Sequence, residues 1–204
     1  SYCAIPMIRG RYRSRSMEAL VEEARGLAAS GVKELIVIAQ DITRYGLDRK
    51  DGSTLAKLLD RLCELDFHWI RLHYLYPEAV TDELIETIAR QPKILHYLDI
   101  PIQHCNDAIL KAMRRRNTRV EIEALFAKLR KAMPDVVLRT SLICGLPGEG
   151  EAEFEELCEF LREAKIERAG VFPFSPEEGT PAARMEYPPK DVAMERAALV
   201  ERLQ

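Results

Sequence analysis

The chain has 204 residues, of which 47% are hydrophobic and 31% are charged, and its formal net charge is −3. A chain of this size can bury a core and is most simply one domain, and its charge gives no overall basic field of the kind that nucleic-acid binding favours. No apolar stretch approaches the roughly 18 residues of a membrane span. Five cysteines at irregular spacing argue against a disulfide framework and predict a reducing compartment, the cytoplasm.

The first predicted helix covers residues 16–30, where apolar side chains recur at helical spacing. Ser16 is suited to cap its amino end, and Gly31 follows its carboxyl end as a C′ residue does. Residues 35–39 then form a continuous apolar run of β-branched type. Such a run is typical of a strand with both faces covered.

The same alternation continues to the end of the chain and predicts an α/β fold. Further helices are expected over residues 53–65, 81–90, 106–114, 118–132, 151–164 and 189–203, and further strands over residues 69–74, 97–102, 136–143 and 169–174. No hairpin turn signals separate the strands, so sequential β-α units imply a parallel sheet with helical crossovers. Periodicity leaves open whether this sheet is open or curls into a barrel.

The unusual polar segments fall where the predicted strands end. They are residues 40–46, 76–78, 103–107, 145–149 and 175–180. In parallel β/α proteins the reactive groups lie at the carboxyl ends of the strands. One rim of the sheet should therefore collect amides, carboxylates and glycine turns, and a small-molecule site is expected there.

Several residues on or near this rim leave alternatives open. Gly145 and Gly148 either form a tight strand-to-helix turn that needs glycine backbone angles, or they present backbone to a nucleoside. His104 is either an acid–base group or a hydrogen-bonding partner of its own loop. Cys105 lies beside it on the rim. The cysteines expected to pack in the core are Cys63, Cys144 and Cys158.

Away from the rim, the run Arg114-Arg115-Arg116 with Arg119 is most simply a solvated helix end. A phosphate or ribosome contact is the alternative, so contact with RNA is left open but is not indicated.

The chain opens on Ser1-Tyr2-Cys3-Ala4-Ile5-Pro6, which looks like the tail of a C-x3-C-x2-C iron–sulfur loop with only its last cysteine, Cys3, present. Four further motifs follow in order, at residues 39–46, 97–104, 139–149 and 174–181. Together the five motifs resemble the methylthiotransferases, a branch of the radical S-adenosylmethionine (SAM) superfamily, over essentially the whole chain. Ala-Ile-Pro after the cysteine and Gln-Asp at 40–41 are most similar to the members that modify an aspartate of a small-subunit ribosomal protein.

The resemblance implies a partial (β/α)6 TIM-like barrel of the radical SAM type, with the first strand and most of the cluster loop missing. Residues 1–204 would form the radical SAM core domain, without the family's N-terminal cluster domain and C-terminal substrate-gripping β-domain. The implied cofactors are SAM and a [4Fe–4S] cluster with three cysteine ligands, and a second [4Fe–4S] cluster in the full-length protein. The fragment alone is expected to be inactive.

The implied reaction starts with a 5′-deoxyadenosyl radical, which abstracts hydrogen from an unactivated C–H carbon of the target aspartate. Sulfur is then inserted there and methylated. The implied partners are the ribosomal protein substrate and a flavodoxin-like electron donor, with no membrane involved.

Roles for single residues also follow from the resemblance. Cys3 would be the third cluster ligand. The residues that would contact SAM are Tyr2, Gln40, Asp41, Gln103, Arg139, Ser141, Gly145, Gly148 and Phe174. The pair at 40–41 would contact its methionine end, the three polar side chains at 103, 139 and 141 its carboxylate and ribose, and Tyr2 with the glycine turn its adenine. No residue of this chain is expected to be catalytic.

Two other functions compete with this one. The chain could be the core of a tRNA methylthiotransferase, in which case a strongly basic substrate-gripping domain is expected in the full protein. It could also be a β/α barrel that has lost catalysis and serves as a binding module, because a fold alone does not fix function.

Overall fold

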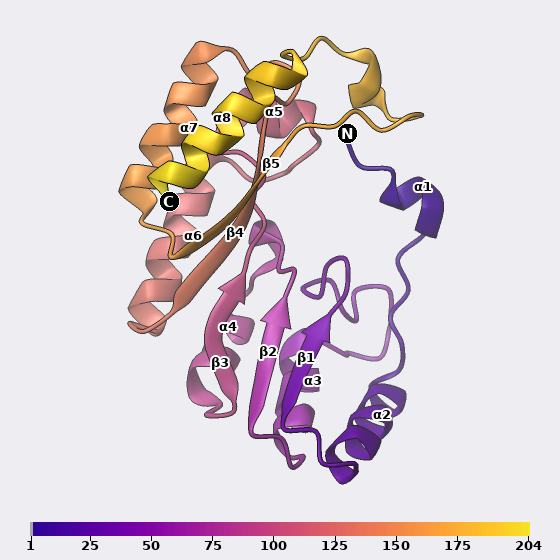
Figure 1. The fold of residues 1–204 in the computed structure, drawn as a ribbon. Coiled ribbons are helices and arrows are strands. Elements are labelled where there is room, and N and C mark those ends of the chain that lie inside the picture. Colours follow the sequence, from indigo (N-terminus) through magenta and orange to yellow (C-terminus); the bar gives the residue numbers. More distant parts are fainter. Residues whose placement is uncertain (1) are drawn as a thin grey trace. The chain divides into compact units, whose positions relative to one another are not determined.

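The computed structural model describes residues 2–204, which divide into two compact units (Figure 1). One unit consists of residues 12–100 and 128–137 and contains the strands β1 (Glu34–Ile38), β2 (Trp69–His73) and β3 (Ile94–Asp99). The other consists of residues 2–11, 101–127 and 138–204 and contains β4 (Val137–Cys144) and β5 (Arg168–Pro173). We call them the β1–β3 unit and the β4–β5 unit. Ser1, the first residue of the cluster-loop motif, lies outside the described residues.

In the β1–β3 unit the three strands pair in parallel, and β2 lies in the middle. Glu34 pairs with Trp69 and Ile38 with His73, while the pairing of β2 with β3 changes register between Ile70 and Leu72. Helices α2 (Met17–Ala29), α3 (Leu55–Cys63) and α4 (Asp82–Arg90) alternate with these strands, and a short 3-10 helix, η1 (Pro77–Ala79), follows β2. This is the β-α order that the sequence predicts.

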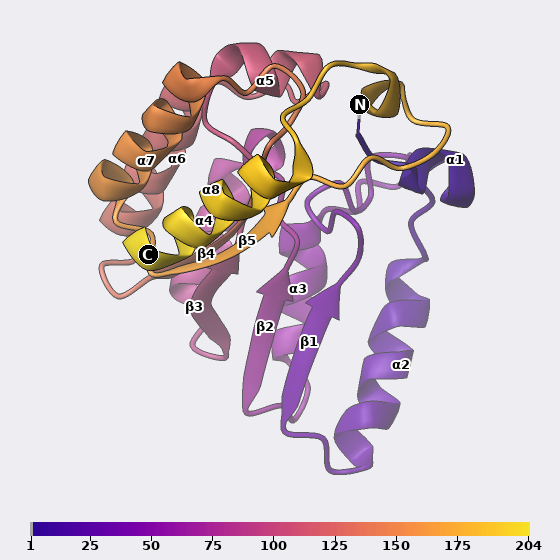
Figure 2. The same ribbon diagram turned by 45° about the horizontal axis from the view of Figure 1, so that its top comes forward.

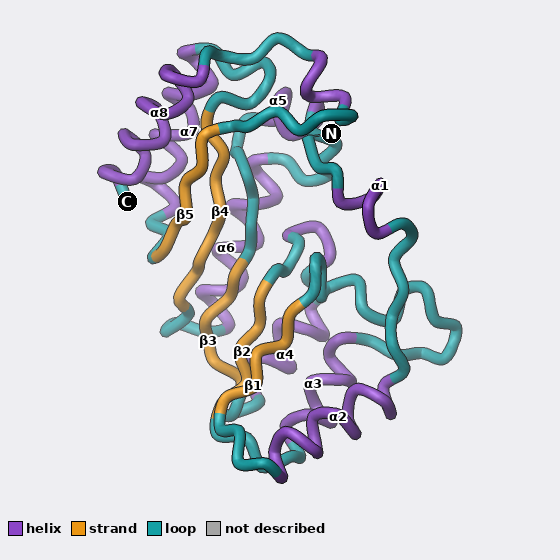
Figure 3. The backbone as a smooth tube through the Cα atoms, turned by 45° about the vertical axis from the view of Figure 1, so that its right-hand side comes forward, coloured by secondary structure: helices purple, strands orange, loops and turns teal. Residues whose placement is uncertain are grey.

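In the β4–β5 unit the two strands also pair in parallel, from Arg139 opposite Arg168 to Cys144 opposite Pro173. The helical elements of this unit are α1 (Ile5–Arg9), α5 (Asp107–Ala112), the start of α6 (Arg119–Ala132), α7 (Glu151–Ala164), the 3-10 helix η2 (Pro181–Arg184) and α8 (Lys190–Leu203). Helix α8 packs on β5 and α7, and Figure 2 shows it running alongside β5. Figure 3 shows how regularly helices separate the strands along the chain.

Side-chain caps fix where many of the helices begin. The N-cap oxygens of Ser16, Thr54, Thr81 and Asn106 each accept a hydrogen bond from the backbone N–H three residues later. At the start of α6, Thr118 and Glu121 bond each other's backbone N–H groups at 3.3 and 2.7 Å, as the capping-box motif predicts. Caps of this kind stabilise a helix by about 1 kcal/mol each, so local sequence sets these boundaries.

Three details differ from the sequence-based expectation. Residues 5–9 form a short helix where a loop was expected, because Pro6 is tolerated in a first helical turn. Strand β3 begins at Ile94, three residues early. The prediction that both faces of the first strand are covered is wrong, since Ile36 and Ile38 are 51% and 61% exposed. An apolar run shows what a strand can bury, not what lies over it.

Within residues 2–204, none of the helices combines the length and apolar character needed to cross a membrane.

Candidate functional site

Strand β4 has one buried face and one partly buried face. Leu138, Leu142 and Cys144 on one face are buried, whereas Arg139 and Ser141 on the other are only partly buried. The alternation follows from the two-residue period of a strand. Both predicted SAM contacts on β4 therefore lie on the same accessible side.

Gln103 forms a parallel bridge with Leu142 of β4. Its N–H donates to the Ser141 carbonyl at 2.9 Å, and its own carbonyl accepts from the Ile143 N–H at 2.8 Å. The backbone φ of Gln103 is 71°, in the left-handed region that residues other than glycine seldom adopt. The structure thus joins the backbones of Gln103 and Ser141 by a hydrogen bond, and the role of both residues in binding SAM stays a prediction.

The turn after β4 is built on two glycines with positive φ, Gly145 at 81° and Gly148 at 87°. The Gly145 N–H donates to Glu149 Oε1 at 2.8 Å, and the Glu149 N–H donates back to the Leu146 carbonyl at 3.0 Å. The requirement for glycine backbone angles is therefore real. It does not exclude a second role in lining a ligand.

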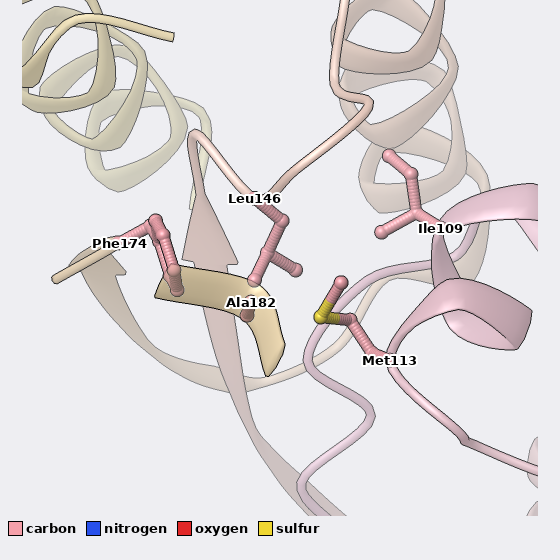
Figure 4. Packing of buried hydrophobic residues seen from close by; sticks show 5 residues of the cluster. All are labelled: Ile109, Met113, Leu146, Phe174 and Ala182. Atoms are coloured by element: carbon pink, nitrogen blue, oxygen red, sulfur yellow. The ribbon is translucent and has the colours of Figure 1, made fainter. Parts of the chain in front are cut away.

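Tyr2 and Cys3 are both partly buried. Tyr2 packs against an apolar cluster made of Ile109, Met113, Leu146, Phe174 and Ala182 (Figure 4). Its hydroxyl accepts a 3.4 Å hydrogen bond from Arg115 Nη2. Tyr2 is thereby tied to the same core as Leu146, the residue after Gly145.

Phe174 is buried in that cluster, with 7% of its surface exposed. Its ring lies edge-on to the ring of Tyr187, with the two ring centroids 5.2 Å apart. Packing in the core therefore accounts for most of its surface. Any contact with a ligand would be made by the small part that is left exposed.

Gln40 and Asp41 follow β1 and belong to the β1–β3 unit. Gln40 is exposed, but Asp41 is buried and accepts hydrogen bonds from both the N–H and the hydroxyl of Thr43. Burial raises the pKa of Asp41, although the bonds from Thr43 act in the opposite direction. The Asp41 side chain thus organises its own loop.

Sequence patterns did not reveal a buried polar group beneath the glycine turn. His104 and Glu149 have fully buried side chains, with His104 Nε2 3.4 Å from Glu149 Oε2. Arg196 of α8 donates to Glu149 Oε1 at 2.9 Å. His104 Nδ1 accepts from the Asn106 N–H at 3.0 Å, so the alternative in which His104 bonds its own loop is correct. Arg196 carried no signal, because it is one of several charged residues on an amphipathic helix.

The residues present fit the expected cofactors in part. Cys3 offers one thiolate, the ligand type that iron–sulfur clusters take. Among residues 2–204, no group of three or more cysteine, histidine or acidic side chains is placed to hold a metal ion. The role of Cys3 as a cluster ligand stays a prediction.

A cavity of about 410 Å³ lies in the β1–β3 unit between α2, β1 and α3. Its walls are mainly apolar and include Leu27, Val37 and Leu58. None of the residues predicted to contact SAM lines it. Its lining does include Ala39 and Ile42, the residues on either side of Gln40 and Asp41.

The solved structures that this chain resembles share its fold at low sequence identity. Coproporphyrinogen III oxidase (HemN) from Escherichia coli, a radical SAM enzyme, matches with a TM-score of 0.66 and 15% identity over 92% of this chain and 45% of that one. The radical SAM methyltransferase TsrM from Kitasatospora setae, solved with cobalamin and a [4Fe–4S] cluster bound, matches with a TM-score of 0.64 and 16% identity over 80% of this chain and 32% of that one. These matches confirm the predicted radical SAM type of α/β fold.

Sequence relatives are much closer. The ribosomal protein uS12 methylthiotransferases RimO of Pelobacter propionicus and Alkaliphilus oremlandii are 56% and 50% identical over 91% of this chain, and 41% and 42% of their own lengths are covered. The RimO protein of Desulforudis audaxviator is 49% identical over 98% of this chain and 46% of its own length. The chain thus spans less than half the length of these curated relatives.

A family model agrees with the motifs and with the fold. The model described as "Radical SAM superfamily" matches residues 1–161, which is most of the chain and includes the Cys3 loop and the glycine turn after β4. Such membership implies a [4Fe–4S] cluster and SAM as cofactors. The chain belongs to the radical SAM superfamily.

Proposed function

We propose that this chain is the catalytic core of a methylthiotransferase that modifies ribosomal protein uS12. The observation that carries the proposal is the 49–56% identity to proteins named for that activity, which extends over at least 91% of the chain. The target would be an aspartate, which receives sulfur and a methyl group at an unactivated C–H carbon. The expected setting is the cytoplasm, with a flavodoxin-like protein as electron donor.

With the cluster and SAM bound, the cofactors would supply the radical that attacks a C–H bond. The residues of this chain would bind and orient SAM. The Cys3 thiolate would be one of three cluster ligands. Gln103 and Ser141, which a backbone hydrogen bond joins, would offer an amide and a hydroxyl to the polar groups of SAM.

The glycine turn would offer backbone to the adenine of SAM. Gly148 is exposed and its φ is positive, so a flat ligand can approach the backbone there without meeting a Cβ. Asp41 would act through its loop, since Thr43 already occupies one of its carboxylate oxygens. Gln40, which is exposed, is better placed for direct contact.

The test uses the full-length protein reconstituted without oxygen with iron and sulfide, then reduced and given SAM and uS12. We expect 5′-deoxyadenosine and a uS12 product heavier by one methylthio group. Cys3→Ala should abolish both, while Cys63→Ala, which changes a partly buried cysteine of α3, should retain both. Modification of tRNA in place of uS12 would contradict the substrate, and a cluster-loaded protein that leaves SAM intact would contradict the reaction.

A further inference from the structure

On the basis of the function proposed above, we propose that Glu149 and Arg196 are positioning residues for the adenosine half of SAM. They would hold the Gly145–Gly148 turn in the conformation that binds it, with His104 linking the turn to the segment of Gln103. Neither residue would touch the ligand. Helix α8, which supplies Arg196, would in this way support the site through the turn without touching the ligand.

Glu149 is the centre of this group. Its Oε1 accepts from the Gly145 N–H at 2.8 Å and from Arg196 Nη1 at 2.9 Å. The same Arg196 nitrogen also donates to the Glu149 carbonyl at 3.0 Å. One guanidinium therefore fixes both the side chain and the backbone of Glu149, and the carboxylate in turn fixes the first amide of the turn.

The charge of Glu149 is retained despite its burial. Burial on its own raises the pKa of the carboxyl group, but the adjacent His104 and hydrogen bonds from the Gly145 amide and Arg196 outweigh it, and the pKa lies below the ordinary value of 4.5. A buried carboxylate with a charged partner holds its geometry firmly, because either group alone would be left desolvated and unpaired.

His104 joins this group to the second predicted SAM segment. Its Nδ1 accepts from the Asn106 N–H, so in the neutral ring the hydrogen is on Nε2, which faces Glu149 Oε2 at 3.4 Å. Neither atom has a hydrogen-bond partner in the part of the chain that the structure describes, so each is the nearest polar contact that this pair of buried groups offers the other. His104 directly follows Gln103, so the contact couples the two segments on which the amide of Gln103 and the glycine turn lie.

Packing immobilises the same turn from two sides. A Cβ on Gly145 would come within 2.4 Å of the Ala193 Cβ, so α8 lies directly against the turn. On another side Leu146 is fully buried and extends toward Ala182 and Met113 in the apolar cluster (Figure 4). Gly145 is thus fixed by α8 and by Glu149, and Leu146 is fixed by the cluster. Backbone groups that recognise a ligand bind it best when they are held in place beforehand.

The test compares two ligands on the cluster-loaded full-length protein. S-adenosylhomocysteine contains the adenosine half of SAM, and methionine lacks it. We expect Arg196→Met, which keeps most of the side-chain length, to weaken binding of S-adenosylhomocysteine about tenfold, the order of effect of one lost hydrogen bond to a charged group. Binding of methionine, measured by equilibrium dialysis under the same conditions, should not change. Arg196→Lys, which keeps the charge, should recover part of the loss.

The matched control is Arg119→Met. Arg119 also belongs to the β4–β5 unit and contacts the carboxylates of Glu123, Glu156 and Glu163, but it has no contact with the turn. The Arg119→Met substitution should lower the melting temperature and leave the affinities for S-adenosylhomocysteine and methionine unchanged. If Arg196→Met lowers only the melting temperature, as the control does, the positioning role is refuted.

A second variant, Glu149→Gln, serves if Arg196→Met does not fold. It keeps an oxygen for the Gly145 N–H and removes the charge, and it should show the same selective loss of adenosine binding. An unchanged affinity for S-adenosylhomocysteine in this variant would overturn the positioning role but not the proposed function. A wild-type protein that binds neither ligand would overturn the proposed function and the inference with it.

Discussion

Gly145 in the turn after β4 lies so close to Ala193 of α8 that no side chain would fit at position 145. A Cβ on Gly145 would meet the Ala193 Cβ at 2.4 Å, far inside contact distance. At Gly148 such a Cβ would have no heavy atom within 4 Å among the described residues. The two glycines have almost the same φ, at 81° and 87°. Both positions therefore require a left-handed backbone, but only Gly145 also lacks room for a side chain.

Alanine substitutions at these glycines should differ in cost. Gly148→Ala should cost about 1 kcal/mol from the left-handed backbone alone. Gly145→Ala adds overpacking against α8 and should cost about 3 kcal/mol in all. Urea unfolding of the full-length protein measures both free energies. Equal costs would mean that α8 moves aside and is not held against the turn.

The buried cysteines should be chemically inert. Desolvation raises the pKa of both Cys105 and Cys144 to about 12, and both are fully buried. Since the thiolate is the reactive form, iodoacetamide at neutral pH should leave them unmodified in the folded, cluster-free protein. Cys3, which is only partly buried, should be labelled first. Peptide mass spectrometry gives the order of modification, and early labelling of Cys105 or Cys144 would contradict the packing described above.

Asp41→Asn should be tolerated by the fold. Burial raises the pKa of Asp41, so its contribution to stability is greatest when it is protonated and declines as the pH rises through the folded-state value. The asparagine keeps an oxygen for the Thr43 N–H and avoids this decline. We therefore expect the variant to gain stability relative to the wild type between acid and neutral pH. A variant less stable than wild type at neutral pH would show that the Asp41 charge is compensated.

Glu149→Gln should have the opposite pH dependence. The pKa of Glu149 is lowered, so its contribution is present above the unfolded-state value and disappears as the pH falls through the folded-state value. At neutral pH the variant should lose about 3 kcal/mol, since Arg196 is left without its buried partner. The difference from wild type should shrink in acid. Glu156→Gln, at a more exposed ion pair with Arg119, should cost less than about 1 kcal/mol.

Local signals predicted much of this fold. Ser16 caps α2 as predicted, because a cap depends on residues only three positions apart. The start of β3 was missed by three residues, since strand pairing and not composition decides where a strand begins. The face of Ile36 and Ile38 was predicted wrongly for a similar reason.

The site divides along the same line. Gln103 could be expected near the other strands because it closely follows one of them, and the strands of a parallel sheet end at a common rim. Arg196 could not, because it reaches Glu149 from 47 residues away along the chain. A contact between a loop and a distant helix leaves no periodic pattern in either segment.

Gln103 has a consequence for engineering. Its φ of 71° costs a residue with a Cβ about 1 kcal/mol relative to glycine. A library of variants selected for thermal stability alone should therefore be enriched in glycine at this position. Each glycine variant would lack the side-chain amide that the proposed site uses. At position 103, selection for stability should thus favour glycine, whereas selection for activity should favour glutamine.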